Sequence, residues 1–311
     1  MPTVICLGIL VADVIGRPIE AVPAPGALTL VESITPHIGG CAANTGIGLH
    51  RLGVETAIVG AVGRDGFGEF VRGVLQDEGM NASGVVEKEG PTSATMVLVS
   101  PDGERAFLHC VGANAAFQKS DVDAATLNSA RLLHIAGHGL MPAFDGAPCA
   151  ELLRNAQSCG VQTALDTAGA PDDKWRANLR QTLPHLDYFV PSLHEIRDLF
   201  PDCPSPESIA ARLIDEGVGC VALKMGEAGS YALNRDGQSA RAAAFAVNAI
   251  DATGAGDAFA AGFLAATLRD LPLETCLKIG NATGARCVKA VGTIAGLGDW
   301  NSTAQMAGIL M

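Results

Sequence analysis

Basic residues are scarce in this chain, which has 21 Lys and Arg against 33 Asp and Glu over 311 residues. The formal net charge of −12 argues against nucleic acid or an acidic membrane surface as a partner, because such binding depends on clustered Lys and Arg. Long apolar runs are missing too, since the opening stretch from Val4 to Ala12 is interrupted at Asp13, far short of a membrane span. No basic segment precedes that stretch, so we expect neither export nor membrane insertion.

Several sequence motifs are also missing. The cysteines form no CxxC pair and no zinc-finger spacing, which predicts reduced, mostly buried thiols in a cytoplasmic protein. There is no GxxxxGK[ST], which excludes a P-loop enzyme, and Gly8 is not part of a GxGxxG, which removes the main support for a dinucleotide-binding dehydrogenase. The nine cysteines are Cys6, Cys41, Cys110, Cys149, Cys159, Cys203, Cys220, Cys276 and Cys287.

What the chain does have is ample core material, with 48% hydrophobic residues. Short apolar runs alternate with helix-like stretches, which is typical of βαβ units and a mainly parallel sheet in a layered α/β fold. No linker divides residues 1–311, so we expect a single domain. The clearest runs are VICLGILV, TAIVGAVG, LLHIAGHGL, QTALDTA, DYFVPS and GCVALKMG.

Two segments, residues 14–38 and 91–113, interrupt this rhythm. In the second, ATMVLVS and RAFLHCV flank PDGE, and the turn formers Asp102 and Gly103 predict a hairpin between these two β-prone runs. An extra small sheet built from both segments would project from the main domain and serve as a lid. Arg105 and His109 lie on the predicted hairpin, where each could face a substrate or solvent.

The most informative stretch is DATGAGDAFAAGFLAATL, residues 251–268. After Gly256 it is apolar on nearly every side, which predicts a buried helix preceded by a glycine-rich loop. Gly254, Ala255 and Gly256 let the backbone approach a ligand closely, and N–H groups at a helix N-terminus bind anions. Phosphate is the natural ligand for such a loop.

Asp257 follows this loop directly. A carboxylate beside a phosphate site repels the ligand, but it makes sense as a general base that takes the proton of a hydroxyl during phosphoryl transfer. The alternative is that Asp257 only caps the helix and the glycines make a turn.

The segment DATGAGDAF resembles the C-terminal signature of the ribokinase-like, or phosphofructokinase B, carbohydrate kinases. GGCAANTGIGLHRLG, from Gly39 to Gly53, resembles the N-terminal signature and is followed by the family-like GRDGFGE, from Gly63 to Glu69. The matches lie at both ends in the correct order, so the resemblance covers essentially the whole chain. It implies a three-layer α/β/α fold with a small β lid, and an ATP- and Mg²⁺-dependent sugar kinase.

On the acceptor side, the resemblance implies that Asp13 hydrogen-bonds the sugar and that Gly39, Gly40 and Asn44 close on its hydroxyls. Glycines permit close backbone approach, while a carboxylate and an amide suit a polyol. Arg105 and His109 are further candidates from the lid. The structural alternatives are a loop cap for Asp13 and a buried helix-start residue for Asn44.

On the nucleotide side, the family's Asn-x-x-Glu motif reads PSLHE here, so Glu195 matches as the residue that organises Mg²⁺ and its waters. Ser192 replaces the Asn, and we expect retained but altered metal affinity. Glu195 as an ordinary solvated helix residue is the alternative.

The segment LKMGEAGSYAL, residues 223–233, resembles the family's nucleotide segment. Gly226 and Gly229 would pass close to phosphates or ribose, and Lys224 could reach phosphate oxygens or be a surface lysine. Asn281 lies where the family lines the adenine pocket.

Two expectations rest on the resemblance alone. Many members bind a monovalent cation through backbone oxygens, and the matching positions are Asp251, Thr253, Ala290 and Gly292, so the resemblance implies K⁺ activation. Many members also form dimers through the lid, so we expect a homodimer. The histidines predict no metal cluster, because His134 and His138 lie on a run that reads as a strand entering a glycine loop.

The sequence does not decide which molecule accepts the phosphoryl group, and sugars, sugar acids, sugar phosphates and nucleosides all stay open. We favour an unphosphorylated sugar or sugar acid, because Arg and Lys are sparse in the predicted lid. A nucleoside kinase would need an aromatic sandwich, for which Phe107 or Phe117 are candidates in a chain with two Trp and two Tyr. A catalytically weak relative that acts as a sugar or nucleotide sensor is the alternative outside the enzymes, with Ser192 as the feature in its favour.

Overall fold

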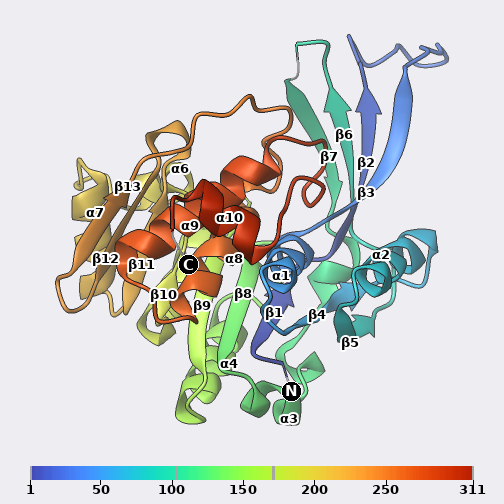
Figure 1. Cartoon of the computed structure of the whole chain (residues 1–311). Coiled ribbons are helices and arrows are strands. Elements are labelled where there is room, and N and C mark those ends of the chain that lie inside the picture. Colours follow the sequence, from blue (N-terminus) through green and yellow to red (C-terminus); the bar gives the residue numbers. More distant parts are fainter. Residues whose placement is uncertain (1, 103, 170–171, 310–311) are drawn as a thin grey trace.

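The computed structural model describes residues 2–102, 104–169 and 172–309 and contains two sheets of unequal size (Figure 1). The larger sheet has nine strands in the order β13-β12-β11-β10-β9-β8-β1-β4-β5. The strands from β11 to β5 run parallel, and β12 and β13 are antiparallel to their neighbours. Their bounds are β1 Val4–Gly8, β4 Thr56–Val62, β5 Asn81–Glu87, β8 Leu132–His138, β9 Gln162–Thr167, β10 Tyr188–Phe189, β11 Cys220–Lys224, β12 Ser230–Asn234 and β13 Ser239–Ala242.

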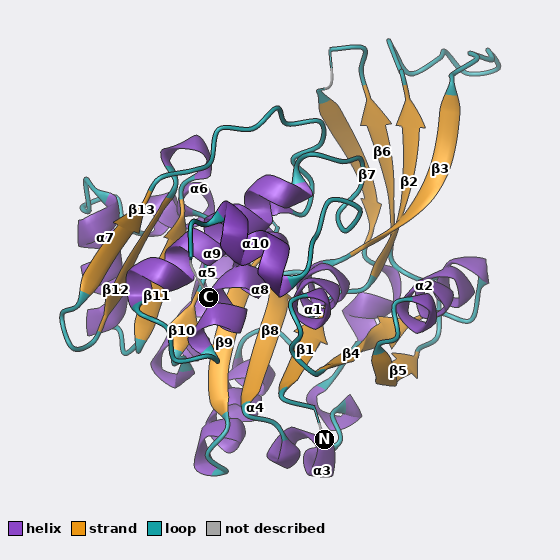
Figure 2. Cartoon of the chain, in the orientation of Figure 1, coloured by secondary structure: helices purple, strands orange, loops and turns teal. Residues whose placement is uncertain are grey.

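Helices cover both faces of this sheet, which gives the expected three-layer α/β/α arrangement (Figure 2). One apolar cluster joins the sheet to α1 Cys41–Arg51, α2 Gly66–Asp77, α8 Ala255–Thr267, α9 Leu273–Cys287 and α10 Trp300–Met306. A second cluster on the opposite face joins it to α3 Ala124–Ser129, α4 Ala147–Ser158, α5 Asp173–Thr182, α6 Leu193–Ile196 and α7 Pro206–Asp215. Ser205 caps α7, because its side chain accepts from the Ser208 N–H in the first turn of the helix.

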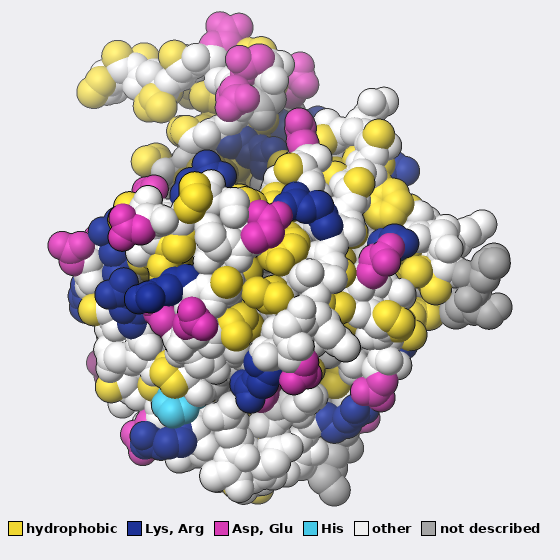
Figure 3. Space-filling view, turned by 90° about the vertical axis from the view of Figure 1, so that its left-hand side faces the viewer, with side chains coloured by type: hydrophobic (Ala, Val, Ile, Leu, Met, Phe, Trp, Pro, Cys, Tyr) yellow, Lys and Arg dark blue, Asp and Glu magenta, His cyan; other side chains and the backbone are white. Residues whose placement is uncertain are grey.

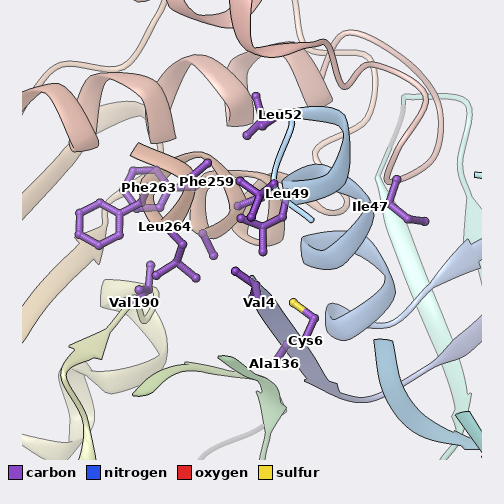
Figure 4. Packing of buried hydrophobic residues seen from close by; sticks show 14 of the residues in the cluster. Val4, Cys6, Ile47, Leu49, Leu52, Ala136, Val190, Phe259, Phe263 and Leu264 are labelled. Carbon is purple, nitrogen blue, oxygen red and sulfur yellow. The ribbon is translucent and has the colours of Figure 1, made fainter. Parts of the chain in front are cut away.

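The first cluster holds the helix that follows the glycine-rich loop. Leu264 of α8, Leu49 of α1 and Val4 of β1 are fully buried and point toward one another (Figure 4). Almost every side of α8 is buried, as its sequence predicts. Packing of this kind fixes the N-terminus of α8 above the carboxyl ends of the parallel strands, where α/β sheets bind their ligands.

The smaller sheet projects from the main body and has the strand order β3-β2-β6-β7 (Figure 1). Strands β6 and β7 form the predicted antiparallel hairpin, in which Gly103 lies outside the described residues, and β2 pairs with β6 in parallel. Its strands are β2 Val11–Arg17, β3 Ser33–Gly39, β6 Ala94–Val99 and β7 Arg105–Cys110, so the small sheet includes both expected segments but begins before residue 14 and extends past residue 38.

One strand prediction is wrong in its extent. The apolar run VICLGILV contains the end of β1 at Gly8 and the start of β2 at Val11, so the chain leaves the large sheet for the lid within it. Gly8 lies so close to β8 that a Cβ on it would be 1.8 Å from the Ala136 carbonyl oxygen. Both strands are largely buried here, and the sequence therefore shows no alternation that would mark the break.

The surface agrees with the acidic composition. Figure 3 shows Lys and Arg side chains scattered among Asp and Glu, with a recess beneath the overhanging lid. Among the described residues, none of the helices combines the length and the apolar composition that crossing a bilayer requires.

Candidate active site

The glycine-rich loop lies at the N-terminus of α8, as predicted. Gly254 caps this helix with φ at 77°, a left-handed conformation that favours glycine, and it leads into Ala255 and Gly256 in the first turn. The first N–H groups of an α-helix have no acceptor within the helix. They therefore point out of the helix toward the end of the sheet, where they can bind an anion.

Asp257 follows in the same turn and is 9% exposed. Its Oδ2 accepts a hydrogen bond from Asn44 Nδ2 at 2.8 Å, and the Cys41 thiol is a second donor. Burial raises the pKa of Asp257 above its ordinary value, while the Asn44 amide, the Lys224 ammonium and the Cys41 thiol oppose this rise. The structure thus brings Asn44, from the N-terminal signature, onto the predicted base.

Polar side chains cross the inner face of the lid in one row, in the order His37, Asp13, Thr95 and His109. Thr95 Oγ1 lies 3.1 Å from His109 Nδ1, and Thr95 also hydrogen-bonds Asp13. Burial raises the pKa of Asp13 to about 6, and the nearby carboxylates of Asp251 and Asp257 add to this effect. His109 therefore shares the face of Asp13.

Gly39 and Gly40 join this row to α1. A Cβ on Gly39 would lie 2.0 Å from Asp13 Oδ2, so only glycine leaves the carboxylate in place. A Cβ on Gly40 would lie 2.4 Å from the Ile9 carbonyl oxygen. These glycines therefore serve the close packing of the protein itself, in addition to any approach to a ligand.

Arg105, at the start of β7 in the lid, reaches the loop that precedes α8 in the main domain. Its Nη1 lies 2.6 Å from Asp251 Oδ1 and also donates to Thr253 Oγ1. Arg105 was expected among the substrate-binding residues. Its guanidinium is already engaged by Asp251 and Thr253, which precede the glycine-rich loop, called the phosphate loop below.

A cavity of about 680 Å³ opens on the other side of Gly256. It is lined on its apolar side by Phe245, Val247, Phe259 and Val288. The predicted nucleotide residues Lys224, Gly226, Gly229 and Asn281 all contribute to its wall, together with Ser192, His194 and Arg197. A volume of this size is ordinary for a small-molecule or cofactor site.

Two of these residues have structural partners as well. Asn281 Nδ2 donates to the carbonyl oxygens of Ala242 and Ala243, at 3.1 and 3.0 Å, and so ties α9 to the end of β13. A Cβ on Gly229 would lie 2.1 Å from the Ala242 oxygen. Gly226, in contrast, has open space around it, which leaves its backbone accessible to a ligand.

Lys224 is buried, so its interpretation as a surface lysine is wrong. Its Nζ lies 2.6 Å from Asp166 Oδ2, at the carboxyl end of β9, and a Cβ on Gly256 would be 3.2 Å from the same Nζ. Burial raises the pKa of Asp166 to about 7, against the effect of the ammonium. Sequence reasoning missed Asp166, although an acid that ends a buried run, as in QTALDTA, was a usable signal.

Glu195 lies in the first turn of α6, in a capping box with Ser192. Its Oε2 accepts from Thr167 Oγ1 at 2.7 Å and from the Ser192 N–H at 3.4 Å. Its other oxygen, Oε1, has no hydrogen-bond partner in the described part of the chain. One free carboxylate oxygen near the cavity at Gly256 fits Mg²⁺, which keeps most of its waters and takes few protein ligands.

The four residues expected around K⁺ come from two segments that do meet. Asp251 Oδ2 accepts from the Gly292 N–H at 2.9 Å, and Oδ1 accepts from the Thr253 N–H at 2.8 Å. Ala290 lies two residues before Gly292 in the same segment. A positive charge is already present here, because Arg105 pairs with Asp251, so the residues present do not call for a second cation.

Two other expectations are resolved by burial. His134 and His138 are fully buried on β8, and burial lowers their pKa values to about 3 and about 4, which agrees with a structural role. Phe117 is 1% exposed and packs edge-on against Phe144, so its proposed role in a base sandwich at the lid is wrong. Phe107 is 55% exposed on the inner face of the lid.

Known proteins resemble this chain in sequence and in overall fold. An ATP-dependent ribose-1-phosphate kinase from Halopiger xanaduensis is 30% identical, with 86% of each chain covered, and a nucleoside kinase from Methanothermobacter thermautotrophicus is 28% identical, covering 90% of this chain and 88% of its own. The solved ribokinase of Arabidopsis thaliana, complexed with ribose and ATP, superposes with a TM-score of 0.86 at 24% identity over 99% of both chains. The model of the pfkB family carbohydrate kinases matches residues 1–300, and the chain therefore belongs to this family of kinases.

Proposed function

We propose that residues 1–311 act as one kinase unit that transfers the γ-phosphoryl group of ATP to a hydroxyl of a small sugar or sugar acid. The observation that carries this proposal is the position of Asp257. Its buried carboxylate lies in the turn that follows the glycine-rich loop, and it is close enough to Asp13 to raise the pKa of that residue. A general base belongs between the acceptor and the phosphate in this way.

The chemistry follows from these positions. Asn44 holds the Asp257 carboxylate in a fixed orientation. Asp257 takes the proton of the acceptor hydroxyl, the oxygen attacks the γ-phosphorus in line, and the bond to the leaving ADP oxygen breaks. The N–H groups from Gly254 to Gly256 stabilise the negative charge on the group in transfer.

The nucleotide occupies the cavity on the other side of the loop. Lys224, at the phosphate end, faces Gly256, whereas Gly226, Gly229 and Asn281 lie along the wall. Mg²⁺, when bound, would neutralise phosphate charge, and Glu195 would hold it through water.

The charge of the acceptor region favours an unphosphorylated substrate. Asp13 lies near two further carboxylates, Asp251 and Asp257, and the cation on this side, Arg105, is already paired. Burial lowers the pKa values of His37 and His109, so neither adds positive charge at neutral pH. A phosphate on the acceptor would therefore meet repulsion from these carboxylates, with Arg105 already engaged.

A nucleoside is the second candidate, and one observation favours it. Beyond the polar row, the inner face of the lid carries Ile15, Val97 and Phe107 in register. An acceptor with a ribose end and a flat apolar end would contact both rows, with its base against Phe107.

The lid also offers an apolar surface for the homodimer that we propose. Its outer face exposes Ile34, Met96 and Leu108, of which the last two are paired across β6 and β7. A second copy of the same face would bury this apolar surface. All nine cysteines are free thiols, which suits the cytoplasmic location we propose.

The test is ADP release from the purified protein with ATP and Mg²⁺, across sugars, sugar acids, sugar phosphates and nucleosides. Asp257→Asn should lower kcat by about 10²–10⁴-fold, the usual share of a general base, with ATP affinity retained. Asp299→Asn is the control, because it removes an exposed capping carboxylate of α10. Retained turnover in Asp257→Asn would refute the role of Asp257 as the general base. ATP binding without ADP release on any acceptor would favour the alternative of a catalytically weak sugar or nucleotide sensor.

A further inference from the structure

Arg105 makes the contact that joins the lid to the phosphate loop. It begins β7, and the loop between β13 and α8 passes beside this strand (Figure 1). Its Nη1 lies 2.6 Å from Asp251 Oδ1 and also donates to Thr253 Oγ1. The two side chains of the ion pair are only 19% and 9% exposed, so solvent screens the pair weakly.

The carboxylate of Asp251 holds together the turn that leads into the phosphate loop. Oδ1 accepts from the Thr253 N–H at 2.8 Å, one residue before Gly254, and Oδ2 accepts from the Gly292 N–H at 2.9 Å. Its charge is therefore shared among two backbone donors and the Arg105 guanidinium. Removal of the guanidinium would leave a mostly buried carboxylate with its charge uncompensated.

The lid touches the same network at a second point. Thr293 Oγ1 donates to the Ile38 carbonyl oxygen of β3 at 2.9 Å, and His37 lies so close to Gly292 that a Cβ there would be 2.7 Å from the ring. A movement of the lid would therefore disturb the turn at Asp251 and the loop at Gly292 together.

A thiol contacts the Thr253 carbonyl oxygen, which is one of the positions expected around an alkali cation. The Cys287 thiol donates to the Thr253 and Thr293 carbonyl oxygens, at 3.5 and 3.2 Å. The positive charge of this region comes from Arg105.

From these contacts, and resting on the proposed kinase activity, we infer that Arg105 is a positioning residue that supplies from the lid the positive charge that orders the phosphate loop. The loop is ordered only while the lid lies over the core, so nucleotide geometry is coupled to lid position without a bound alkali cation. Potassium is then dispensable for this enzyme, in contrast to the expectation from the family.

The experiment compares the wild type with Arg105→Ala and Arg105→Lys, with and without potassium chloride at matched ionic strength. Lys88→Ala is the matched control, since Lys88 and Asp121 form a partly buried ion pair of similar length, 2.7 Å, away from the site. Melting temperature and affinity for a non-hydrolysable ATP analogue are measured first, because neither needs the acceptor. Turnover with the acceptor found in the panel follows.

We expect the wild type to show no specific response to K⁺ in melting temperature, nucleotide affinity or turnover. Arg105→Ala should lose on the order of tenfold to a hundredfold in turnover through a displaced loop, with K⁺ restoring part of the loss and raising its melting temperature. Arg105→Lys should keep most of the wild-type behaviour, because it keeps the charge.

Two results would overturn the inference: K⁺ binding that stabilises the wild type as much as Arg105→Ala, or an Arg105→Ala protein indistinguishable from Lys88→Ala in nucleotide affinity. Because these are binding and melting readouts, they decide the inference even if no acceptor is phosphorylated.

Discussion

Replacement of Lys224 by Met should destabilise the protein strongly, because it leaves a buried carboxylate alone. Lys224 and Asp166 are 10% and 2% exposed at a separation of 2.6 Å. Removal of one partner of a buried ion pair costs about 3–5 kcal/mol. At roughly 2–4 °C per kcal/mol for a large domain, this predicts a melting temperature lower by roughly 6–20 °C.

A double variant separates the charge from the packing. Lys224→Met with Asp166→Leu replaces both ions with apolar groups of similar volume, which is often neutral or stabilising. Its melting temperature should therefore recover most of the loss, while turnover stays low because the nucleotide cavity lacks Lys224. Circular dichroism melts and ADP release measure the two effects independently.

The pH dependence of the single variant gives a further check. Burial raises the pKa of Asp166 from 3.8 to about 7 even beside the ammonium, and loss of Lys224 can only raise it further. A folded state that binds a proton more tightly than the unfolded state gains stability as pH falls. Lys224→Met should thus recover stability between pH 7 and pH 4.

Two outcomes would refute this reasoning. One is a Lys224→Met protein as stable as the wild type near neutral pH, which would mean that Asp166 is solvated. The other is a double variant no more stable than the single one, which would mean that packing, and not the uncompensated charge, carries the effect.

Three further predictions concern the acceptor and the metal. Because burial raises the pKa of Asp13 to about 6, the acceptor KM should rise as pH falls below that value and the carboxylate takes up a proton, and Asp13→Asn should abolish this dependence in steady-state kinetics. Gly39→Ala should raise the acceptor KM about tenfold, since its Cβ displaces the Asp13 carboxylate, whereas Gly73→Ala, with open space around it, should leave KM unchanged. Ser192→Asn restores the family motif and should lower the Mg²⁺ concentration for half-maximal ADP release by roughly tenfold, while an unchanged Mg²⁺ titration would show that Ser192 already serves as well.

The parts that sequence reasoning predicts are those in which neighbours along the chain determine the structure. The glycine loop and Asp257 are contiguous, so their place in the first turn of α8 follows from local pattern. The lid hairpin follows in the same way from two β-prone runs around a turn.

The parts it missed are side-chain pairs between segments that only the fold brings together. Asp166 and Lys224 are 58 residues apart, and Arg105 and Thr253 are 148 apart. No local pattern distinguishes a lysine that ends a buried strand from one at the surface. The pairing depends on β9 and β11 lying on either side of β10, a strand of two residues.

These distant pairs also explain how the proposed base can be ionised while it is buried. Asp257 needs to be ionised before it takes a proton, yet burial opposes its charge. Asn44 from the acceptor side, Lys224 from the nucleotide side and the N-terminal end of α8 each favour the carboxylate. Each of the three belongs to an element that also contacts a substrate in the proposed reaction, so the same contacts that orient the base keep it charged.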